Sequence, residues 1–559
     1  MTSVEAPKVS GRHPKAWLER PWVFHPFLVT LPTLLAFTQK NLAMAGPEAG
    51  VWMYLVFCGV AVVGMLLLQQ ILGNPRKAGV IVSLLLLGFV ANKSMGDWSS
   101  TIWLGIFAAV VGAALMRTRM DIPTTFFNVA ALIAVAKPVY DFVQANNAPH
   151  QPVVKADYLE SGRVVPHPPP NPPDIYYIVL DGYGRSDVLR RLYAFDNKLP
   201  KELEKRGFYV ADQAHSNYSQ TALCFSATFN MDWVENLLDQ PDKKSQWRRP
   251  LSQLVSDNRT VHGLRDAGYH IIEYPSEYSV THLADPDESR SPFLYFTEYE
   301  YIFLSGTALG KGTKLLGYPQ ARVSQEIRRN TLSWVLTDLR KGDRTPGPAF
   351  VYAHLVAPHP PFLFKPDGSY RRSDLPATFN DGSHWKGLAK RSKEKYVPGY
   401  RDAVQYLDDM LIEAVDGILK NSEQPPIIII QGDHGPASKL DWKSDKKTDL
   451  QERMSILLAY HFPDQDYSQL REDITPINSF RVVFNQYLGA EIPQVEDKVY
   501  FNVWSSPYRP IDVTEQLRKL DHPEEAIPTD EVEGDVAEPE EKLRKPKNPM
   551  FSVPRVKHE

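Results

Sequence analysis

The first 145 residues contain five apolar segments, and this repetition constrains the fold more than any other feature of the chain. The segments cover residues 22–43, 50–72, 77–94, 100–117 and 124–144. Each is close to the roughly 20 residues that a helix needs to cross the hydrocarbon core of a bilayer. A cleavable signal peptide has one such run followed by a small-residue cleavage site, so the repetition argues against that interpretation. The sequence therefore predicts a membrane anchor of five transmembrane helices over residues 22–146.

Charged residues between the segments predict the orientation of this anchor. The N-terminal stretch 1–21 is basic, and basic residues recur in every second loop: Arg76, Lys77, Arg117 and Arg119. The intervening loops carry Glu48 and Asp97. Cytoplasmic loops are enriched in Lys and Arg, so the N-terminus is predicted to be cytoplasmic. The chain that follows the fifth helix is then outside the cytoplasm.

The rest of the chain divides into a linker, a soluble domain and a charged tail. Residues 147–173 end in a proline-rich run, which favours stiff polyproline geometry over helix or sheet. Residues 174–505 alternate strand-like and helical patterns, which predicts an α/β domain with a mostly parallel central sheet. Residues 506–559 lose this periodicity and contain an acidic block before a basic one, so a largely disordered tail is predicted.

Charge and cysteine content limit the classes of function. The formal net charge of -4 lacks the basic excess that binding to nucleic acid requires, so no nucleic-acid partner is predicted. The two cysteines are far apart, with Cys58 in an apolar segment and Cys224 in the soluble domain. No disulfide between them is predicted.

Two strands of the predicted sheet end on side chains that bind metal ions. The run 174–181 ends at Asp181, and the four isoleucines 427–430 precede Asp433 and His434. Ligands gather at the carboxyl ends of parallel strands, and carboxylate oxygen with imidazole nitrogen suits zinc or manganese. A turn in which Asp bonds to the backbone would explain either stretch alone. Because the pattern recurs within one domain, we favour a metal site.

Thr221 is the candidate nucleophile. It lies in a polar stretch, 217–221, that runs into an apolar segment with a helical pattern. A threonine hydroxyl is a weak nucleophile at neutral pH, but coordination to a metal lowers its pKa. The alternative interpretation is an N-cap, with Ser219 or Thr221 opening the helix. Both roles are compatible, because a helix N-terminus also attracts an anionic substrate. Ser219 is the rival nucleophile.

Further residues are candidates for contact with a phosphate group. His359 lies past a strand end in a proline-rich loop, where it can donate a hydrogen bond or protonate a leaving group. Arg185 and Arg453 can bind phosphate bidentately. His354 lies inside the preceding apolar run and is interpreted first as a structural or supporting residue.

Four segments together resemble the sulfatase-like branch of the alkaline phosphatase superfamily. They are residues 178–185, 220–226, 357–362 and 431–436, and their order and spacing fit from about residue 174 to residue 489. The helical anchor before the domain is similar to that of the membrane phosphoethanolamine and phosphoglycerol transferases, including lipoteichoic acid synthase.

The resemblance implies roles for the residues already singled out. Asp181, Thr221, Asp433 and His434 would hold one divalent metal ion, zinc or manganese, with a second ion left open. His359 would face the substrate. The resemblance also implies a phospholipid donor, a covalent phospho-threonine intermediate, and an envelope glycan or lipid as acceptor.

The chain departs from these families in three places. Residues 224–228 lack the proline or alanine and the arginine of the sulfatase signature C/S-x-P/A-x-R, which argues against sulfate ester hydrolysis. Phosphoethanolamine transferases usually carry several disulfides, so the single cysteine of the soluble domain favours the phosphoglycerol side. The basic group that these families often show after the Asp-His pair has its nearest counterpart around Arg453.

We therefore predict a metal-dependent phosphotransferase of the bacterial inner (plasma) membrane. Its N-terminus would be cytoplasmic and its catalytic domain periplasmic or extracellular. Two alternatives stay open: a phosphodiesterase or phosphatase-type hydrolase of the same fold, and a non-catalytic protein of envelope assembly.

Overall fold

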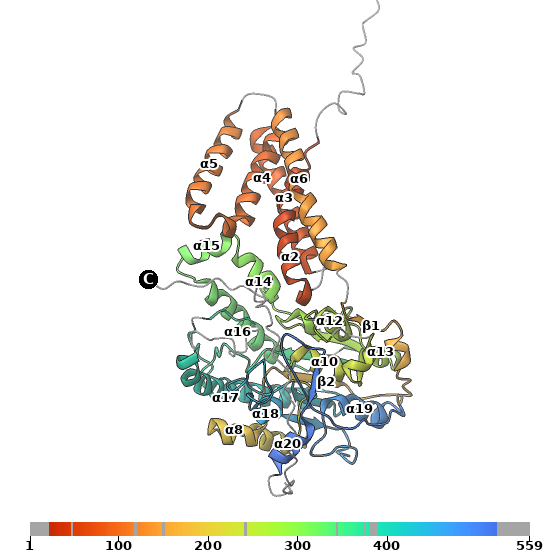
Figure 1. Ribbon diagram of the computed structural model, residues 1–559. Coiled ribbons are helices and arrows are strands. Elements are labelled where there is room, and N and C mark those ends of the chain that lie inside the picture. The colour runs from red at the N-terminus through yellow and green to blue at the C-terminus, as the bar shows by residue number, and fades with distance from the viewer. Residues whose placement is uncertain are drawn as a thin grey trace, which may run out of the picture. The chain divides into compact units, whose positions relative to one another are not determined.

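The protein consists of two compact units in the computed structural model, which describes residues 22–45, 49–116, 120–147, 151–239, 243–342, 345–373, 375–378 and 389–522. The helical unit comprises residues up to 147, apart from 43–45, together with Ile302–Leu315 from the middle of the chain. The α/β unit comprises the remainder (Figure 1). The predicted cytoplasmic stretch 1–21 and residues 523–559 of the predicted tail lie outside the described residues.

The N-terminal part of the helical unit has six α-helices and a 3₁₀ helix over Asn92–Trp98. The α-helices are α1 (His25–Leu28), α2 (Leu31–Ala45), α3 (Ala49–Leu72), α4 (Pro75–Val90), α5 (Ser99–Leu115) and α6 (Asp121–Asn146). Among the described residues, α3 and α6 are long and apolar enough to cross a membrane, and α5 is a shorter apolar helix. The five predicted spans are therefore not confirmed. The first predicted segment is divided between α1 and α2, and α4 has 16 residues, which is short of a full span.

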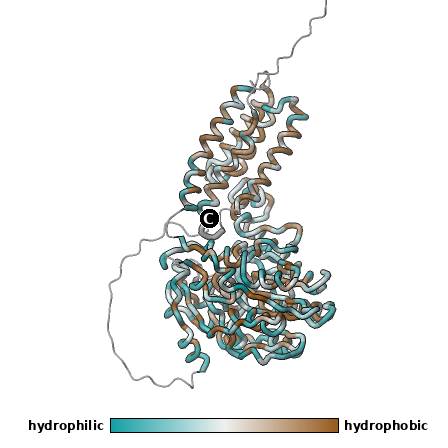
Figure 2. Tube along the Cα trace, turned by 90° about the vertical axis from the view of Figure 1, so that its right-hand side faces the viewer, coloured by the Kyte–Doolittle hydropathy of each residue, from teal (hydrophilic) through white to brown (hydrophobic). Residues whose placement is uncertain are grey.

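The packing of these helices fits a membrane anchor. Helix α4 lies inside the unit, with Val80, Ile81 and Leu86 all buried. Helix α3 instead exposes large apolar side chains, such as Leu66 and Leu67, which are 57% and 56% exposed. Figure 2 shows hydrophobic residues along the helices of this unit. Continuous apolar surface of this kind marks contact with lipid or protein rather than with water.

A segment from the middle of the chain belongs to the helical unit, which the predicted domain boundaries did not anticipate. Helix α14 (Glu298–Ser305) begins in the α/β unit and ends in the helical unit, where α15 (Ala308–Leu315) follows. Phe303 packs edge-on against Phe37 and Phe57, with ring centroids 5.3 and 6.0 Å apart. The prediction that residues 174–505 form one continuous domain therefore needs correction, because apolar contacts hold this segment among the N-terminal helices.

The centre of the α/β unit is a seven-stranded sheet in the order β3-β9-β8-β2-β7-β5-β6. The strands are β2 (Ile175–Leu180), β3 (Tyr209–Val210), β5 (His270–Tyr274), β6 (Glu288–Ser289), β7 (Ala349–Leu355), β8 (Ile427–Gly432) and β9 (Leu458–His461). Strands β8, β2, β7, β5 and β6 run parallel, whereas β9 is antiparallel to both β8 and β3. The sheet is thus mixed, with the predicted parallel arrangement at its centre. The connection from β8 to β9 contains one short helix, α18 (Leu450–Met454).

Helices cover both faces of the sheet, which explains why its central strands are apolar throughout. Residues of alternating parity on β2 enter two separate cores: Ile178 packs with α16 (Gln320–Leu339) and α17 (Ala389–Asn421), whereas Tyr177 packs with α10 (Thr221–Asn230), α13 (Arg259–Asp266) and α19 (Ser479–Tyr487). Strands buried on both faces lose the alternation of polar and apolar residues. The other helices before the long α16 are α8 (Ser186–Tyr193), α9 (Leu199–Glu204), α11 (Val234–Leu237) and α12 (Arg249–Ser256).

Two predicted irregular regions contain regular structure. The predicted linker supplies β1 (Val153–Val154), which pairs with β4 (Leu238–Asp239), and the short helix α7 (Tyr158–Ser161). The predicted disordered tail supplies β11 (Pro510–Asp512), which pairs with β10 (Tyr500–Asn502), and the helix α20 (Thr514–Asp521). The prediction of disorder from residue 506 is therefore wrong for residues 510–521. Leu517 of α20 is buried beside Met454 of α18, so tertiary packing stabilises a helix too short to recognise by periodicity.

Candidate active site

The ends of β2 and β8 meet the start of α10, and this brings metal-binding side chains together. Strands β2 and β8 are parallel neighbours in which Leu180 lies opposite Gly432, so Asp181 and Asp433 follow at the same edge of the sheet. Ligand atoms of Asp181, Asp433 and His434 all lie within 4.8 Å of one another, and the three residues are buried.

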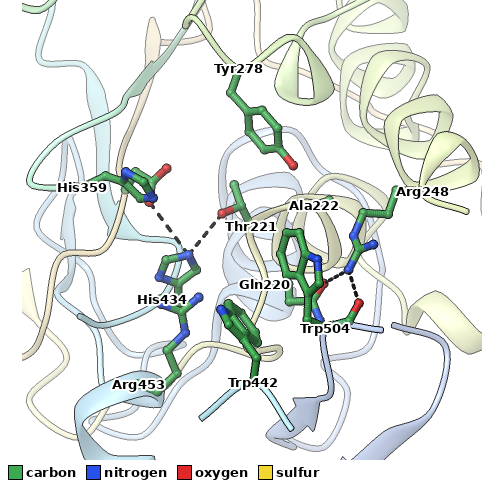
Figure 3. A pocket seen from close by; sticks show the side chains of 11 residues that line it. Gln220, Thr221, Ala222, Arg248, Tyr278, His359, His434, Trp442, Arg453 and Trp504 are labelled. Atoms are coloured by element: carbon green, nitrogen blue, oxygen red, sulfur yellow. Dashed lines mark hydrogen bonds and ion pairs between the residues drawn. The ribbon is translucent and has the colours of Figure 1, made fainter. Parts of the chain in front are cut away.

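Thr221 completes this cluster as the first residue of α10. Its Oγ1 lies 3.1 Å from His434 Nε2, and Figure 3 shows the two side chains pointing toward each other. The same Nε2 is 3.3 Å from Asp433 Oδ2 and 3.8 Å from Asp181 Oδ1. The structure therefore brings together all four residues of the predicted metal set.

The protonation of these side chains suits a divalent ion. His434 Nδ1 lies 3.0 Å from Gly435 O and donates to it, so Nε2 carries the lone pair that faces Thr221 and the two acids. Burial, together with the charge of Arg453, lowers the pKa of His434 and keeps the imidazole neutral. Burial raises the pKa of Asp433 to about 6, although backbone N–H groups of Gly182 and His434 donate to its Oδ1. Two carboxylates, a neutral imidazole and a hydroxyl form a donor set that fits zinc or manganese.

A glycine allows the loop after β8 to aim these ligands. A Cβ on Gly435 would lie 1.9 Å from the carbonyl oxygen of Glu452, which is a backbone atom and cannot move aside. The N–H of Gly435 donates to the carbonyl of Arg453 at 2.7 Å. The turn that carries His434 is therefore held against the chain leading into β9.

Three residues of the cluster, Asp181, Thr221 and His434, line a pocket. Its lining comes from several distant parts of the chain: Asp181, Gln220, Thr221, Ala222, Arg248, Tyr278, His359, His434, Trp442, Arg453 and Trp504. Because α10 starts here, its first backbone N–H groups also face this region, an arrangement that favours an anionic ligand. The pocket therefore combines a metal-type donor set with groups that attract negative charge.

One wall of the pocket consists of two tryptophans, each stacked on an arginine. The guanidinium of Arg248 lies 4.0 Å from the ring centre of Trp504, and that of Arg453 lies 4.9 Å from the ring centre of Trp442. The two tryptophan rings are 5.1 Å apart (Figure 3). Arg248 also donates to Gln220 Oε1 at 2.9 Å. Burial lowers its pKa to about 10, so the side chain stays charged at neutral pH.

Of the residues in this wall, only Arg453 was predicted from the sequence. Arg248 precedes α12, whereas Trp442 lies between β8 and α18 and Trp504 follows β10, so no local spacing connects them. The one available signal is their residue type, since tryptophan and arginine are the side chains that stack in this way. That signal is too common in a sequence to identify a site.

The two predicted phosphate-binding arginines differ in position. Arg453 lines the pocket, where its Nε and Nη2 donate to Ser219 O at 3.0 and 2.7 Å and its Nη1 donates to Gly435 O at 3.1 Å. It therefore ties the Thr221 loop to the His434 loop. Arg185 is not among the residues that line the pocket.

Arg185 is instead engaged by two carboxylates. Its Nε and Nη2 donate to Asp187 at 2.7 and 3.0 Å, and Nη2 also donates to Asp521 Oδ1 at 3.0 Å. Arg185 and Asp521 are both 7% exposed at the side chain. The geometry thus favours a structural role for Arg185 over the predicted contact with phosphate, because α20 supplies a buried partner that the sequence analysis assigned to a disordered tail.

The two histidines of the 354–359 stretch both lie near the cluster. His359 lines the pocket, with its Nδ1 2.7 Å from Pro360 O. His354, on β7, has its Nε2 3.7 Å from Asp181 Oδ2, while its Nδ1 is 3.0 Å from Thr281 Oγ1. Burial lowers the pKa of His354 to about 3, so its ring is neutral. The roles predicted for His359, facing the substrate, and for His354, supporting the site, stay predictions.

The rival nucleophiles are turned to other partners. Ser219 Oγ accepts from Asn502 N at 2.9 Å and donates to Asn502 O at 3.3 Å. The thiol of Cys224 donates to Tyr218 O at 2.9 Å, is buried, and has its pKa raised by that burial. The N-cap of α10 is Gln220, with no capping hydrogen bond from its side chain. Thr221 alone among these hydroxyl and thiol groups lines the pocket.

Comparison with protein families gives a match within the α/β unit. Residues 198–456 match the sequence model of the Sulfatase family. This stretch contains Thr221, His359, Asp433, His434 and Arg453, and it begins after Asp181. The search of curated proteins found no match.

Solved structures give further similarities. The periplasmic domain of EptC from Escherichia coli aligns with a TM-score of 0.39 at 11% identity, covering 63% of this chain and 96% of that one. The integral membrane protein lipooligosaccharide phosphoethanolamine transferase A from Neisseria meningitidis aligns at 0.37 and 13%, covering 83% and 94%. The phosphonate monoester hydrolase of Agrobacterium radiobacter aligns at 0.37 and 13%, covering 59% and 80%.

Proposed function

We propose that the α/β unit, whose residues 198–456 match the Sulfatase family model, is the catalytic domain of a membrane-anchored, metal-dependent phosphotransferase of the alkaline phosphatase superfamily. One observation carries the proposal: Thr221 Oγ1 lies 3.1 Å from His434 Nε2 in the lining of the pocket, beside Asp181 and Asp433. Cys224, three residues after Thr221, is buried and does not line the pocket. This argues against a sulfatase that depends on a modified cysteine.

The residues divide the reaction between them. Asp181, Asp433, His434 and Thr221 would hold one divalent ion, zinc or manganese, which when bound would lower the pKa of the Thr221 hydroxyl and polarise a phosphoryl oxygen. Thr221 Oγ1 would attack the phosphorus of a phospholipid, and the bond from phosphorus to the diacylglycerol oxygen would break. His359 would protonate that oxygen as it leaves.

The second half of the reaction returns Thr221 to its free form. A hydroxyl of an envelope glycan or lipid would attack phospho-Thr221 and pass its proton to His359, which gave one up in the first step. The bond from phosphorus to Thr221 Oγ1 would break, and Oγ1 would take back from solvent the proton that it released before its attack. The N-terminus of α10 and Arg453 supply positive potential beside the phosphate in both steps.

The charges of the pocket favour a phosphoglycerol head group over phosphoethanolamine. Arg248 and Arg453 both line the pocket, and Asp181 is the single acidic side chain among the described lining residues. A bound divalent ion would neutralise that carboxylate, so an ammonium group would face two guanidinium groups without an anionic partner. A glycerol hydroxyl carries no charge and can accept from a guanidinium, and its carbon face can pack on Trp442 or Trp504.

The helical unit supports an outer location for the domain. Ile302–Leu315 is continuous at both ends with chain of the α/β unit, yet it packs on the α4–α5 loop, where the N–H of Lys93 donates to Gly306 O at 3.0 Å. The chain on either side of Ile302–Leu315 would therefore leave the anchor on the side of the membrane that carries the α4–α5 loop. That is the non-basic side, so we propose a bacterial inner (plasma) membrane protein with a cytoplasmic N-terminus and a periplasmic or extracellular domain.

Capture of the head group tests the proposal. Full-length protein loaded with zinc or manganese is incubated with phosphatidylglycerol labelled in its head group, quenched in acid and analysed by mass spectrometry. We expect labelled phosphoglycerol on the peptide that contains Thr221. Thr221→Ala should abolish capture, whereas the matched variant Ser219→Ala should retain it. Capture by Thr221→Ala, or a well-folded protein that binds no metal, would disprove the proposal.

The fate of the captured group separates transfer from hydrolysis. Release of diacylglycerol from phosphatidylglycerol or phosphatidylethanolamine, with the label passed to an added hydroxyl compound, supports the transferase. Inert lipids together with turnover of soluble phosphodiesters would favour a hydrolase of the same fold, in which water replaces the acceptor.

A further inference from the structure

Ile302–Leu315 is attached to the helical unit by polar and apolar contacts along its whole length. Phe303 packs against two phenylalanines of α2 and α3. Asn92 Nδ2 donates to Thr307 O at 3.4 Å, and the N–H of Lys93 donates to Gly306 O. Lys311 Nζ donates to Ser99 Oγ at 2.6 Å. The segment therefore packs at the end of the bundle where the chain passes from α4 to α5.

The side of this segment that does not face the bundle combines lysine with exposed leucine. Residues 302–318 contain no Asp or Glu but carry Lys311 and Lys314. Leu309 and Leu315 are 48% and 80% exposed, and Lys314 is exposed beside them. A short helix with leucine and lysine outward and no acidic residue has the composition of an element that lies in a membrane interface.

The segment contacts residues 92–100, at an end of the α4 and α5 helices. This stretch follows α4 and includes the start of α5, and its Trp98 is 71% exposed. Tryptophan and lysine gather at the ends of membrane spans, where their polar atoms reach the head groups. A segment fixed to this stretch would lie at the same depth as the head groups on the outer side.

We propose that residues 302–315 form an interfacial segment that binds the head groups of anionic phospholipids on the outer face of the membrane. Leu309 and Leu315 enter the boundary of the acyl chains, and the exposed Lys314 pairs with a lipid phosphate, whereas Lys311 holds the segment to Ser99. Anionic lipid then accumulates at the anchor. The inference rests on the part of the proposed function that places the anchor in a bilayer, and on none of its chemistry.

Spin labels in full-length protein test where the segment lies. The variant used has Cys58 replaced and is reconstituted in nanodiscs of phosphatidylglycerol and phosphatidylcholine. The thiol of Cys224 is buried and does not react with the label. A label at Leu315→Cys is compared with one at Leu67→Cys on α3 and one at Glu423→Cys, an exposed residue before β8. We expect the label at residue 315 to collide with oxygen in preference to a water-soluble nickel chelate, as the label at residue 67 does.

Each other outcome has a separate meaning. If residue 67 favours oxygen but residue 315 behaves like residue 423, the segment lies in water and the inference is wrong. If residue 315 is shielded from both reagents, protein covers the segment and the lipid assignment is also wrong. If residue 67 itself favours the nickel chelate, the proposed membrane anchor fails first.

Charge reversal tests the head-group contact independently of depth. Lys314→Glu, in the protein that carries the Leu315→Cys label, should shift the equilibrium at least about fivefold toward the nickel-accessible state in discs rich in phosphatidylglycerol. In discs of phosphatidylcholine alone the shift should be much smaller. Lys420→Glu, which reverses an exposed lysine at the end of α17, is the matched control and should change neither value. An equal shift in both lipids would show that Lys314 does not pair with anionic lipid.

Discussion

The two walls of the pocket are built in different ways. On the metal side, Asp181 and Asp433 each follow a buried strand, and the two strands are neighbours in the sheet. On the other side, Arg248, Trp442 and Trp504 come from loops and are held by stacking on one another and by bonds to backbone carbonyls. The first wall is positioned by the fold, whereas the second is positioned by its own side chains. We expect the first to determine whether the reaction occurs and the second to determine which donor is used.

The largest effect is expected on the metal side. Asp433→Asn keeps the shape of the side chain but replaces a charged ligand by a neutral amide, so metal affinity should fall by more than about 100-fold and turnover by about 1,000-fold or more. Metal content is measured on the purified protein by mass spectrometry, and turnover as diacylglycerol released. Asp409→Asn, an exposed residue of α17, is the matched control. Undiminished metal content and turnover in Asp433→Asn would remove the basis of the comparison.

A smaller effect of a different kind is expected on the arginine–tryptophan wall. Arg248→Gln should raise the KM for phosphatidylglycerol about tenfold, because one charge-assisted contact is lost, with a smaller change in kcat. It should also reduce the preference for phosphatidylglycerol over phosphatidylethanolamine. Arg249→Gln changes the neighbouring arginine, which is not among the lining residues, and serves as the control. A collapse of kcat at unchanged KM would place Arg248 in the chemistry instead of in donor recognition.

The same difference explains what could be predicted from the sequence. Asp181, Asp433 and His434 end apolar runs, so a rule about strand ends was enough to group them. Thr221 begins a helix, and the resemblance to the sulfatase-like enzymes added it to the group. Arg248 and Trp504 are 256 positions apart in a contact that no periodicity encodes. The position of Arg185 could not be predicted, because its partner Asp521 lies far along the chain. Asp521 belongs to a helix of eight residues that only tertiary packing stabilises. Sequence rules thus capture what the sheet positions and miss what distant loops assemble.

Arg185 tests this distinction between the two walls, because it was predicted to bind phosphate but belongs to neither wall. Arg185→Gln should lower the free energy of unfolding by about 3 kcal/mol, because it leaves the buried carboxylate of Asp521 without its guanidinium partner. The KM for the donor should change little. Thermal unfolding in detergent and steady-state kinetics on the same preparation measure the two effects. Asp521→Asn in the Arg185→Gln background should recover part of the stability. A KM raised tenfold at unchanged Tm would instead restore the phosphate-binding role.

The smallest effect on turnover is expected from Glu273, a buried carboxyl of β5 that does not line the pocket. Burial raises its pKa to about 8 from an ordinary 4.5, although Leu283 N donates to its Oε1 at 2.9 Å. The folded protein therefore keeps the proton while the unfolded chain releases it, so the stability of the fold falls as pH rises from 4.5 to 8 and is level above that. Glu273→Gln retains the acceptor for Leu283 and cannot ionise.

The variant should therefore match the wild type near pH 4.5 and exceed it at pH 8 by an amount on the order of 4 kcal/mol, read as a higher Tm in detergent. Its kcat and KM should be unchanged, because neither wall includes Glu273. Glu423→Gln, an exposed glutamate, should show no such dependence on pH. Equal Tm differences at pH 5 and pH 8 would mean that Glu273 is ionised in the fold. A change in kcat without a change in Tm would mean that the metal side of the pocket extends through β7 to β5. The wall that the fold positions would then include more of the sheet than Asp181 and Asp433.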